Sequence, residues 1–257
     1  MTRSFAVCVA VALAGVSSAT LMGQGRAAGP GPGAQAPTPR AQAPVDLTGY
    51  WVAVISEDWR WRMVTPPKGD YPSIPLNMAG QRVADAWDPA KDEAAGEQCK
   101  AYGAPGVMRG PTRLHITWQS DNVLKVDTDY GTQTRLLRFG GAPPAAGGQR
   151  TWQGQTVAEW LIRAGRGRGA QRYGGLKTVT TQLRPGYLRK NGVPYSANAV
   201  FTEYWDVHVR ANGTRYLVVT NTVDDPTYLQ DAWATAIHFV QEPDGSKWDP
   251  TPCDARF

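Results

Sequence analysis

The sequence predicts an all-β fold, an antiparallel barrel or sandwich of about eight to ten strands with one short helix. From residue 49 onward, short runs alternate apolar and polar residues with the period of two that a strand requires. Turn-forming residues separate these runs, and one segment has the spacing of an amphipathic helix. We find no internal repeat in the chain.

The first 28 residues have the pattern of a secretory signal peptide, because Arg3 precedes an apolar run that small residues follow. Residues 29–45 are rich in Gly, Pro, Ala and Gln, which predicts a flexible linker. Residues 46–257 are then a single folded domain, in which no run is apolar for long enough to cross a membrane. We expect a periplasmic or secreted protein without stable membrane insertion; a retained N-terminal anchor is the alternative.

The first strand is predicted at residues 49–55, which open the domain with alternating apolar side chains. A helix follows in "MAGQRVADAWD", where Asn77 can cap the first turn and Asp88-Pro89 ends the helical pattern. The residues after that helix, which carry Cys99, read as a polar connection.

Between the first strand and the helix lies "EDWRWRMVTPPKGDYP", in which aromatic and basic residues alternate before a run of prolines. The alternation predicts a continued strand, with Trp59 and Trp61 on one face and Arg60 and Arg62 on the other. We expect the tryptophans inside and the arginines in water. The opposite orientation would make the arginines partners of Glu203 and of an anionic ligand.

The rest of the chain is a series of strand-like runs separated by turns such as "SDN", "NGVPYSAN" and "ANG". The main runs are "RLHITWQ", "VLKVDTDY", "GTQTRLLRF", "TVAEWLI", "LKTVTTQL", "AVFTEYWDVHV", "RYLVVTNTV" and "ATAIHFVQE".

The formal charge of +5 does not indicate a nucleic-acid partner. Arg3, Arg26 and Arg40 precede Asp46, the first acidic residue, which leaves the domain at about +2, close to neutral. The basic stretch "RAGRGRGAQRYGG" reads as a flexible insert, because it lacks the interleaved aromatic residues of an RNA-binding segment.

Removal of a signal peptide would remove Cys8 and leave two cysteines, Cys99 and Cys253. In an oxidising compartment the two predict one disulfide; two unpaired buried thiols are the alternative. Closing so long a loop would contribute roughly 4–5 kcal/mol in the chain-entropy model.

Several short motifs resemble those of known proteins. Gly49-x-Trp51 in "LTGYW" resembles the first-strand signature of lipocalin-like barrels, which favours a barrel. Six further segments resemble, in their order, a group of exported bacterial proteins of unsettled function: "CKAYGAPGVM", "TQTRLLRF", "WQGQTVAEW", "NGVPYSANAVFTEYW", "DDPTYLQDAW" and "PTPC". Members of that group place histidines at the Gly-x-Pro-x-Ser turn, where this chain has Val193 and Tyr195. A histidine-based role at that turn is therefore not implied.

Glu203 is the candidate for chemistry, because alternation in "AVFTEYWDVHV" puts it on one face with Phe201 and Trp205. A carboxylate among such neighbours is desolvated, which suits acid or base catalysis or ligand binding. A structural carboxylate paired with an arginine is the alternative. Arg135 is the expected inner partner, since it lies in the strand run "TRLLRF", which resembles the arginine-bearing strand of the exported group. Its other interpretation is an arginine at the barrel end stacked on Trp51, as in lipocalin-like folds.

Three histidines lie in three different predicted strands, and His208 falls on the face opposite Glu203. A three-histidine metal site therefore fails if Glu203 points inward, and we predict no cofactor. Hydrolase, phosphate-binding and dinucleotide-binding motifs are absent from the sequence.

The chain contains 10 Trp, 10 Tyr and 5 Phe, more than packing alone requires, which suits a pocket for a flat ligand. We predict binding of a small apolar or aromatic molecule inside the barrel, with Glu203 and Arg135 as its polar anchor. The alternatives are a lyase, isomerase or hydrolase that uses Glu203 as general acid or base, and a structural or sugar-binding envelope protein. The predicted ligand-binding residues are Trp51, Trp59, Trp61, Trp118, Tyr130, Trp205, Tyr228 and Trp233.

Overall fold

A computed structural model describes residues 36–141, 148–164 and 172–256, and the folded unit begins at Pro37. The signal peptide predicted at residues 1–28 lies outside the described residues, as does most of the Gly/Arg insert. No helix within the described ranges is long and apolar enough to span a membrane.

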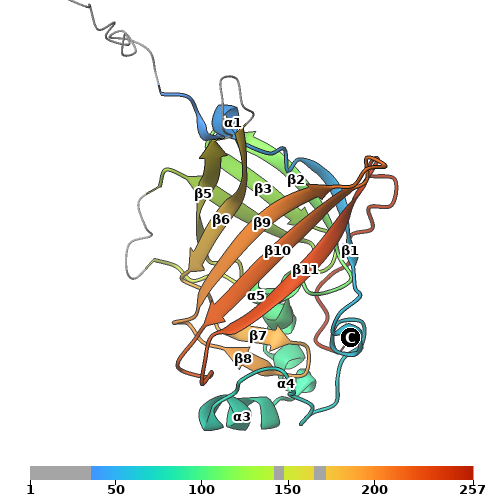
Figure 1. Ribbon diagram of the computed structural model, residues 1–257. Helices are drawn as coiled ribbons and strands as arrows, with labels where there is room; N and C mark the ends of the chain where they lie inside the picture. Colours follow the sequence, from blue (N-terminus) through green and yellow to red (C-terminus); the bar gives the residue numbers. More distant parts are fainter. Residues whose placement is uncertain (1–35, 142–147, 165–171, 257) are drawn as a thin grey trace, which may run out of the picture. The chain divides into compact units, whose positions relative to one another are not determined.

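Nine strands close into a barrel in the order β1-β11-β10-β9-β6-β5-β4-β3-β2, which confirms the all-β barrel (Figure 1). These strands are β1 Gly49–Val54, β2 Arg113–Ser120, β3 Val123–Thr128, β4 Gln133–Phe139, β5 Gln155–Ala164, β6 Arg172–Thr181, β9 Val200–Val209, β10 Arg215–Asp224 and β11 Trp233–Glu242. A separate hairpin consists of β7 Gly186–Arg189 and β8 Val193–Tyr195.

One strand pair departs from the expected antiparallel arrangement. β4 and β5 run parallel, with Leu137 paired to Thr156. A parallel pair needs a crossover of about a dozen residues or more, and the connection over residues 140–154 is long enough to supply it.

Alternating side chains fill the interior of the barrel. Each strand contributes residues at every second position, so that large apolar groups from opposite walls meet inside. The fully buried ones include Trp51, Leu114, Ile116, Leu124, Val126, Leu137, Leu176, Trp205, Leu217, Val219 and Phe239.

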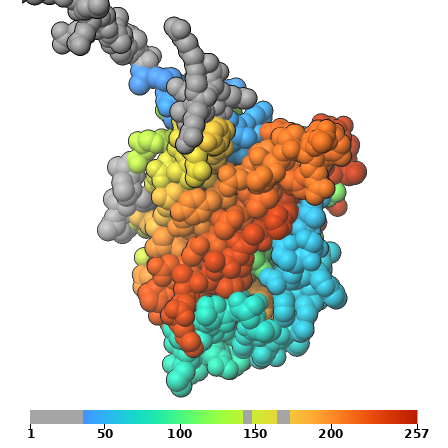
Figure 2. All heavy atoms as spheres, viewed as in Figure 1, coloured from blue at the N-terminus to red at the C-terminus, as the bar shows by residue number. Residues whose placement is uncertain are grey.

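One end of the barrel carries a cap, whose helices are seen in teal at the bottom of Figures 1 and 2. Its elements are α3 Met78–Asp85, α4 Pro89–Ala94, the 3₁₀ helix η1 Gln98–Tyr102, α5 Ala104–Val107 and the β7–β8 hairpin. Together with nearby strand ends they enclose a second apolar cluster that includes Ile74, Leu188, Tyr195 and Phe201. The short helix α1 Pro39–Gln42 lies at the opposite end, where Trp160 Nε1 donates to the Pro39 carbonyl at 2.7 Å.

The described residues contain more helices than the one that the sequence predicts. The Asn77 side chain does cap α3, accepting from the amides of Ala79 and Gly80 at 2.9 Å. Asp88-Pro89, however, starts a new helix rather than only ending one, because Asp88 caps α4 and Pro89 occupies its first turn. The polar connection around Cys99 is therefore helical over most of its length.

The strand predicted for "WRWR" was wrong: Trp59–Arg62 is one helical turn, α2. β1 ends at Val54, and Asp58 takes a left-handed conformation (φ 54°) that breaks the extended chain. The preferred orientation was also wrong, because Trp59 is 63% exposed whereas Arg62 is buried at 2%. Arg62 pairs with Glu57, not with Glu203.

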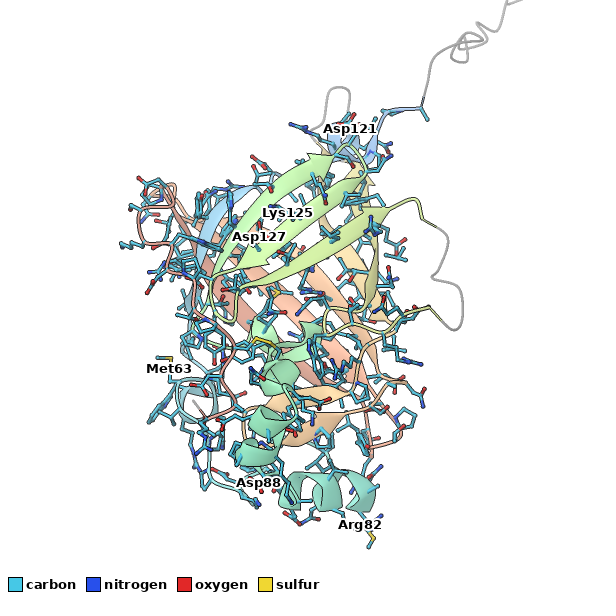
Figure 3. The ribbon with its side chains drawn as sticks, turned by 180° about the vertical axis from the view of Figure 1, so that it is seen from behind. Met63, Arg82, Asp88, Asp121, Lys125 and Asp127 are labelled. Carbon is cyan, nitrogen blue, oxygen red and sulfur yellow. A yellow bond between two sulfur atoms is a disulfide. The ribbon has the colours of Figure 1, made fainter. Side chains whose placement is uncertain are left out.

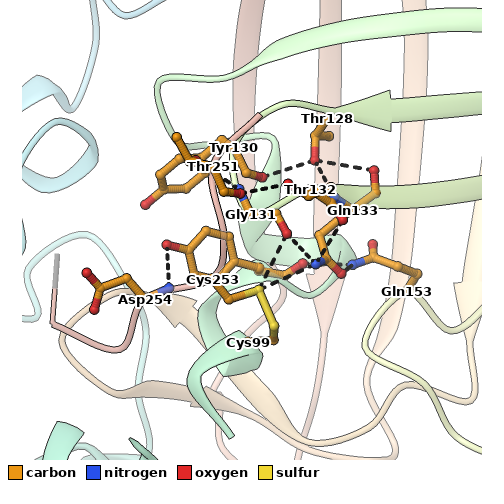
Figure 4. The surroundings of a disulfide bond; sticks show 11 residues. Cys99, Thr128, Tyr130, Gly131, Thr132, Gln133, Gln153, Thr251, Cys253 and Asp254 are labelled. Carbon is orange, nitrogen blue, oxygen red and sulfur yellow. Dashed lines mark hydrogen bonds between the residues drawn. A yellow bond between two sulfur atoms is a disulfide. The ribbon is translucent and has the colours of Figure 1, made fainter. Parts of the chain in front are cut away.

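The predicted disulfide between Cys99 and Cys253 is confirmed (Figure 4). It joins the C-terminal segment to η1 in the cap. Thr251 N donates to the Asp129 carbonyl at 2.9 Å, and Asp254 N donates to Tyr102 Oη at 3.2 Å. The C-terminal segment is thus fixed against the barrel end at three points.

Candidate functional site: a cation pocket at the capped end

Glu203 and Arg135 meet inside the barrel, as the sequence predicts. Arg135 Nη1 and Nη2 donate to Glu203 Oε1 and Oε2 at 2.9 and 2.5 Å. Thr178 Oγ1, directly opposite Glu203 in the register of β6 and β9, donates to Oε2 at 2.8 Å. All three side chains are fully buried. The pair therefore has both carboxylate oxygens occupied by protein donors.

The surroundings of this pair are packed with side chains. The Arg135 guanidinium lies 5.7 Å from the Phe201 ring and 6.0 Å from the Trp205 ring, and its Nη1 also contacts Met108 Sδ at 2.9 Å. This arrangement explains why a glutamate is stable among aromatic residues, since a buried carboxylate needs a paired, hydrogen-bonded cation. The catalytic or ligand-anchoring role expected for Glu203 and Arg135 stays a prediction.

The predicted aromatic ligand-binding residues lie in several places. Trp51 and Trp205 are wholly buried in the barrel, and the arginine over Trp51 is Arg215, at 5.5 Å, rather than Arg135. Trp118 packs with Phe139 and Trp160 toward the α1 end. Trp59 is exposed on α2, and Tyr228 lies in the loop before β11. The remaining three, Trp61, Tyr130 and Trp233, lie at or beside a pocket at the capped end.

Four cationic side chains line that pocket, which we call the cation pocket: Arg62, Arg109, Arg189 and Lys190. Arg62 ends α2, Arg109 follows α5, and Arg189 and Lys190 lie at the end of β7, so three segments distant in sequence supply them. The three arginines are 2%, 7% and 5% exposed. The free space in this partly open pocket is about 20 Å³, more than the roughly 10–15 Å³ that one water molecule needs.

Local structure fixes the hairpin that carries two of these cations. Asn191 Nδ2 donates to the carbonyls of Pro67 and Asp70 at 3.0 Å each, which ties the β7–β8 turn to the proline-rich loop. Gly192 has φ +84°, and a Cβ there would lie 2.2 Å from Trp87 Cβ. Only glycine fits this turn, which holds Arg189 and Lys190 toward the pocket.

Arg62 and Arg109 are paired with carboxylates. Arg62 Nη1 bonds Glu57 Oε1 at 2.5 Å, and Arg109 Nη2 bonds Asp58 Oδ2 at 3.1 Å. Arg62 Nε donates to the Arg109 carbonyl at 2.7 Å. Within the part of the chain that the structure describes, buried Arg62 Nη2 has no hydrogen-bond acceptor.

Arg189 and Lys190 have a different environment. Arg189 donates to the carbonyls of Asp70 and Pro72 at 3.3 and 3.1 Å, and its guanidinium lies 4.9 Å from the Trp61 ring. Among the described residues it forms no ion pair. Lys190 Nζ lies 4.7 Å from the Tyr130 ring.

The electrostatics of the pocket follow from burial and like charge. Burial and the charge of Arg109 lower the pKa of Arg62 to about 10. The same two causes, in the same order, lower the pKa of Arg189 to about 10, although Asp58 and Asp70 oppose the change. Burial lowers the pKa of Lys190 to about 8, with Asp254 opposing. At neutral pH all remain cationic, so the pocket concentrates positive charge in a poorly hydrated space.

A chain of contacts joins the pocket to the barrel interior. Arg109 Nη1 donates to Thr235 Oγ1 at 2.9 Å, and Thr235 Oγ1 donates to Asn221 Oδ1 at 3.0 Å. Asn221 lies opposite Glu203 in the register of β9 and β10. The Arg109 guanidinium also lies 4.7 Å from the Trp233 ring. The pocket is thus built on the packed core and not on a loose loop.

Sequence reasoning did not identify Arg109, Arg189 or Lys190 as site residues. "LRKNG" looks like a solvated hairpin turn, and Arg109 follows a segment that shows no strand pattern. The one cue available for Arg109 is the density of proline and glycine between residues 65 and 110, which marks irregular segments of the kind that often carry functional residues.

The three histidines do not meet. His208 is exposed on the outside of β9, His115 stacks on Tyr50 with 4.1 Å between ring centroids, and His238 Nδ1 lies 3.2 Å from Glu57 Oε2. Across the described ranges, no group of three His, Cys, Asp or Glu side chains has the arrangement of a metal site.

The chain matches no protein-family model, no curated protein and no solved structure in the three comparisons made. The resemblance to lipocalin-like barrels and to exported bacterial proteins therefore stays a prediction.

Proposed function

We propose that this protein binds a small organic anion, whose carboxylate or similar head group enters the cation pocket. The observation that supports this most directly is the convergence of three buried arginines and the half-buried Lys190 on one small space, with Arg62 Nη2 left without an acceptor among the described residues. Buried charges are costly unless they are paired, so an anion at this point would stabilise the cap.

The barrel interior is a poorer place for a ligand. Trp51, Trp205 and Phe239 fill it together with aliphatic side chains, and protein donors occupy both carboxylate oxygens of Glu203, although Arg135 Nε has no acceptor among the described residues. The small molecule that the aromatic content suggests is better accommodated at the capped end, where Trp61 and Tyr130 supply aromatic walls beside the cations. The disulfide supports action in an oxidising compartment, the periplasm or the outside of the cell.

Sodium formate, the smallest carboxylate, tests this proposal. If formate binds the folded protein with a Kd of about 10 mM, 100 mM formate raises the free energy of unfolding by about 1.4 kcal/mol. Lys190→Met should remove most of this gain, whereas Lys190→Arg should keep it. Arg210→Met is the matched control, because Arg210 is exposed on the barrel rim over Tyr216.

Urea denaturation of each variant with and without formate gives these gains, and general salt effects cancel in the comparison. An equal gain in the wild type, Lys190→Met and Arg210→Met would overturn the proposal. Binding should also weaken above about pH 8, because Lys190 then loses its charge.

A further inference from the structure

An open hollow lies beside the cation pocket and shares two lining residues with it. Met63, Val64 and Thr65 form one side, and Thr251, Pro252 and Asp254 form the other. Lys190 and Tyr130 line both this hollow and the cation pocket. The hollow measures about 600 Å³, so its capacity is far larger than that of the pocket. We call it the apolar hollow.

Apolar side chains stay exposed on the first wall. Met63 is 49% and Val64 57% exposed, directly after the buried Arg62, and Figure 3 shows Met63 projecting from the surface. Arg62 anchors this wall through Glu57 and the Arg109 carbonyl. The exposed position of Met63 and Val64 is thus imposed by a buried anchor next to them.

The opposite wall is anchored independently. The disulfide and the backbone bonds of Thr251 and Asp254 hold the C-terminal segment against η1 and the β3–β4 turn (Figure 4). Because both walls are fixed before any ligand arrives, binding would require little ordering of the protein. An apolar hollow with a few polar groups at its base is the usual form of a small-molecule site.

The charged side chains around the hollow would orient an anionic ligand in it. Asp254 lines the hollow but not the cation pocket, whereas Lys190 lines both. An anionic group is repelled by the carboxylate and attracted inward, where Arg62, Arg109 and Arg189 add to the positive potential. An uncharged chain or ring is left to cover the apolar wall.

From these observations the structure assigns an amphiphilic carboxylate as ligand, with its head group in the cation pocket and its hydrocarbon part along the apolar hollow. This assignment rests on the proposed function. The pocket is much smaller than the hollow, so a ligand whose head group occupies the pocket must extend out of it, and the hollow is the adjoining space that can receive the rest.

Calorimetric titration of the full chain with sodium formate, butyrate, hexanoate and octanoate tests the assignment. Affinity should rise about two- to four-fold for each added methylene, since each buried methylene adds favourable transfer free energy. Octanol, which lacks the charge, should bind at least ten-fold more weakly than octanoate.

Two variants locate the site. Val64→Ser should reduce the gain per methylene and leave formate binding unchanged, whereas Lys190→Met should weaken every member of the series. Val209→Ser is the matched control, because Val209 is a similarly exposed valine, at 64%, on β9.

The outcomes are distinct. If formate binds in a Lys190-dependent way but chain length has no effect, the assignment is wrong and the proposed function stands. If no carboxylate binds, both are wrong. Octanoate binding that Val64→Ser does not change, or octanol binding as tight as octanoate, also overturns the assignment.

Discussion

Removing the charge of Glu203 should destabilise the protein strongly while leaving its shape almost unchanged. Glu203→Gln preserves the volume of the side chain, but Arg135 then remains buried with a neutral partner. Both groups are fully buried, so water cannot replace the lost charge. Breaking such a pair costs about 3–5 kcal/mol, a large part of the roughly 5–15 kcal/mol that stabilises a typical domain.

Urea denaturation at pH 7 measures this loss directly, and the thermal midpoint should fall by roughly 6–20 °C in a protein of this size. Glu159→Gln is the control, because Glu159 is also a strand glutamate in an ion pair, with Lys177 at 2.9 Å, yet its side chain is 60% exposed. The control should change stability by less than about 1 kcal/mol.

Replacing both partners separates the cost of an unpaired charge from the value of the pair. Arg135→Met with Glu203→Leu removes both charges, so the double variant should be more stable than Arg135→Met or Glu203→Gln alone. A Glu203→Gln variant within about 0.5 kcal/mol of the wild type would refute the reasoning, since surface substitutions of no structural importance fall in that range.

Three further predictions concern the cap. The pKa of Lys190 is about 8 in the folded protein and ordinarily 10.5, so the unfolded chain binds more protons between these two pH values. The free energy of unfolding of the wild type should therefore rise from pH 8 to pH 10.5 relative to Lys190→Met, by up to about 3 kcal/mol, as measured in urea titrations. Replacing both Cys99 and Cys253 by alanine should cost roughly 4–5 kcal/mol, and the denatured, unreduced full chain should label at Cys8 alone; labelling of three thiols would contradict the disulfide. Gly131→Ala should lower the thermal midpoint more than Gly69→Ala. Both glycines have positive φ, but only at Gly131 would a Cβ meet a side chain, lying 2.1 Å from Tyr102 Cδ1. Equal losses would show that φ alone matters.

Period-two alternation was sufficient to predict the barrel and its interior. In β9 it placed Phe201, Glu203 and Trp205 on the inner face, and burial of one carboxylate required a cation, for which Arg135 was the expected strand residue. These inferences held because a strand in a barrel has one buried face, which fixes every second side chain.

The cap was not predictable in the same way. Trp59–Arg62 alternates like a strand, but the conformation of Asp58 and the burial of Arg62 against Glu57 decide its structure. The cation pocket depends on three segments that are distant in sequence and have no common period. Which polar side chains turn inward there is decided by tertiary contacts, such as those of Asn191 with the proline-rich loop.

The closure of the barrel has a consequence for how the chain folds. β1 pairs with β11, from Tyr50 opposite Glu242 to Val54 opposite His238. One edge of β1 pairs with β2, and the other edge stays unpaired until β11, the last strand, has formed. Contacts so distant in sequence slow folding, and until they form, two strand edges are open to pairing with other chains. A chain cut after β10 should consequently aggregate rather than form a smaller barrel.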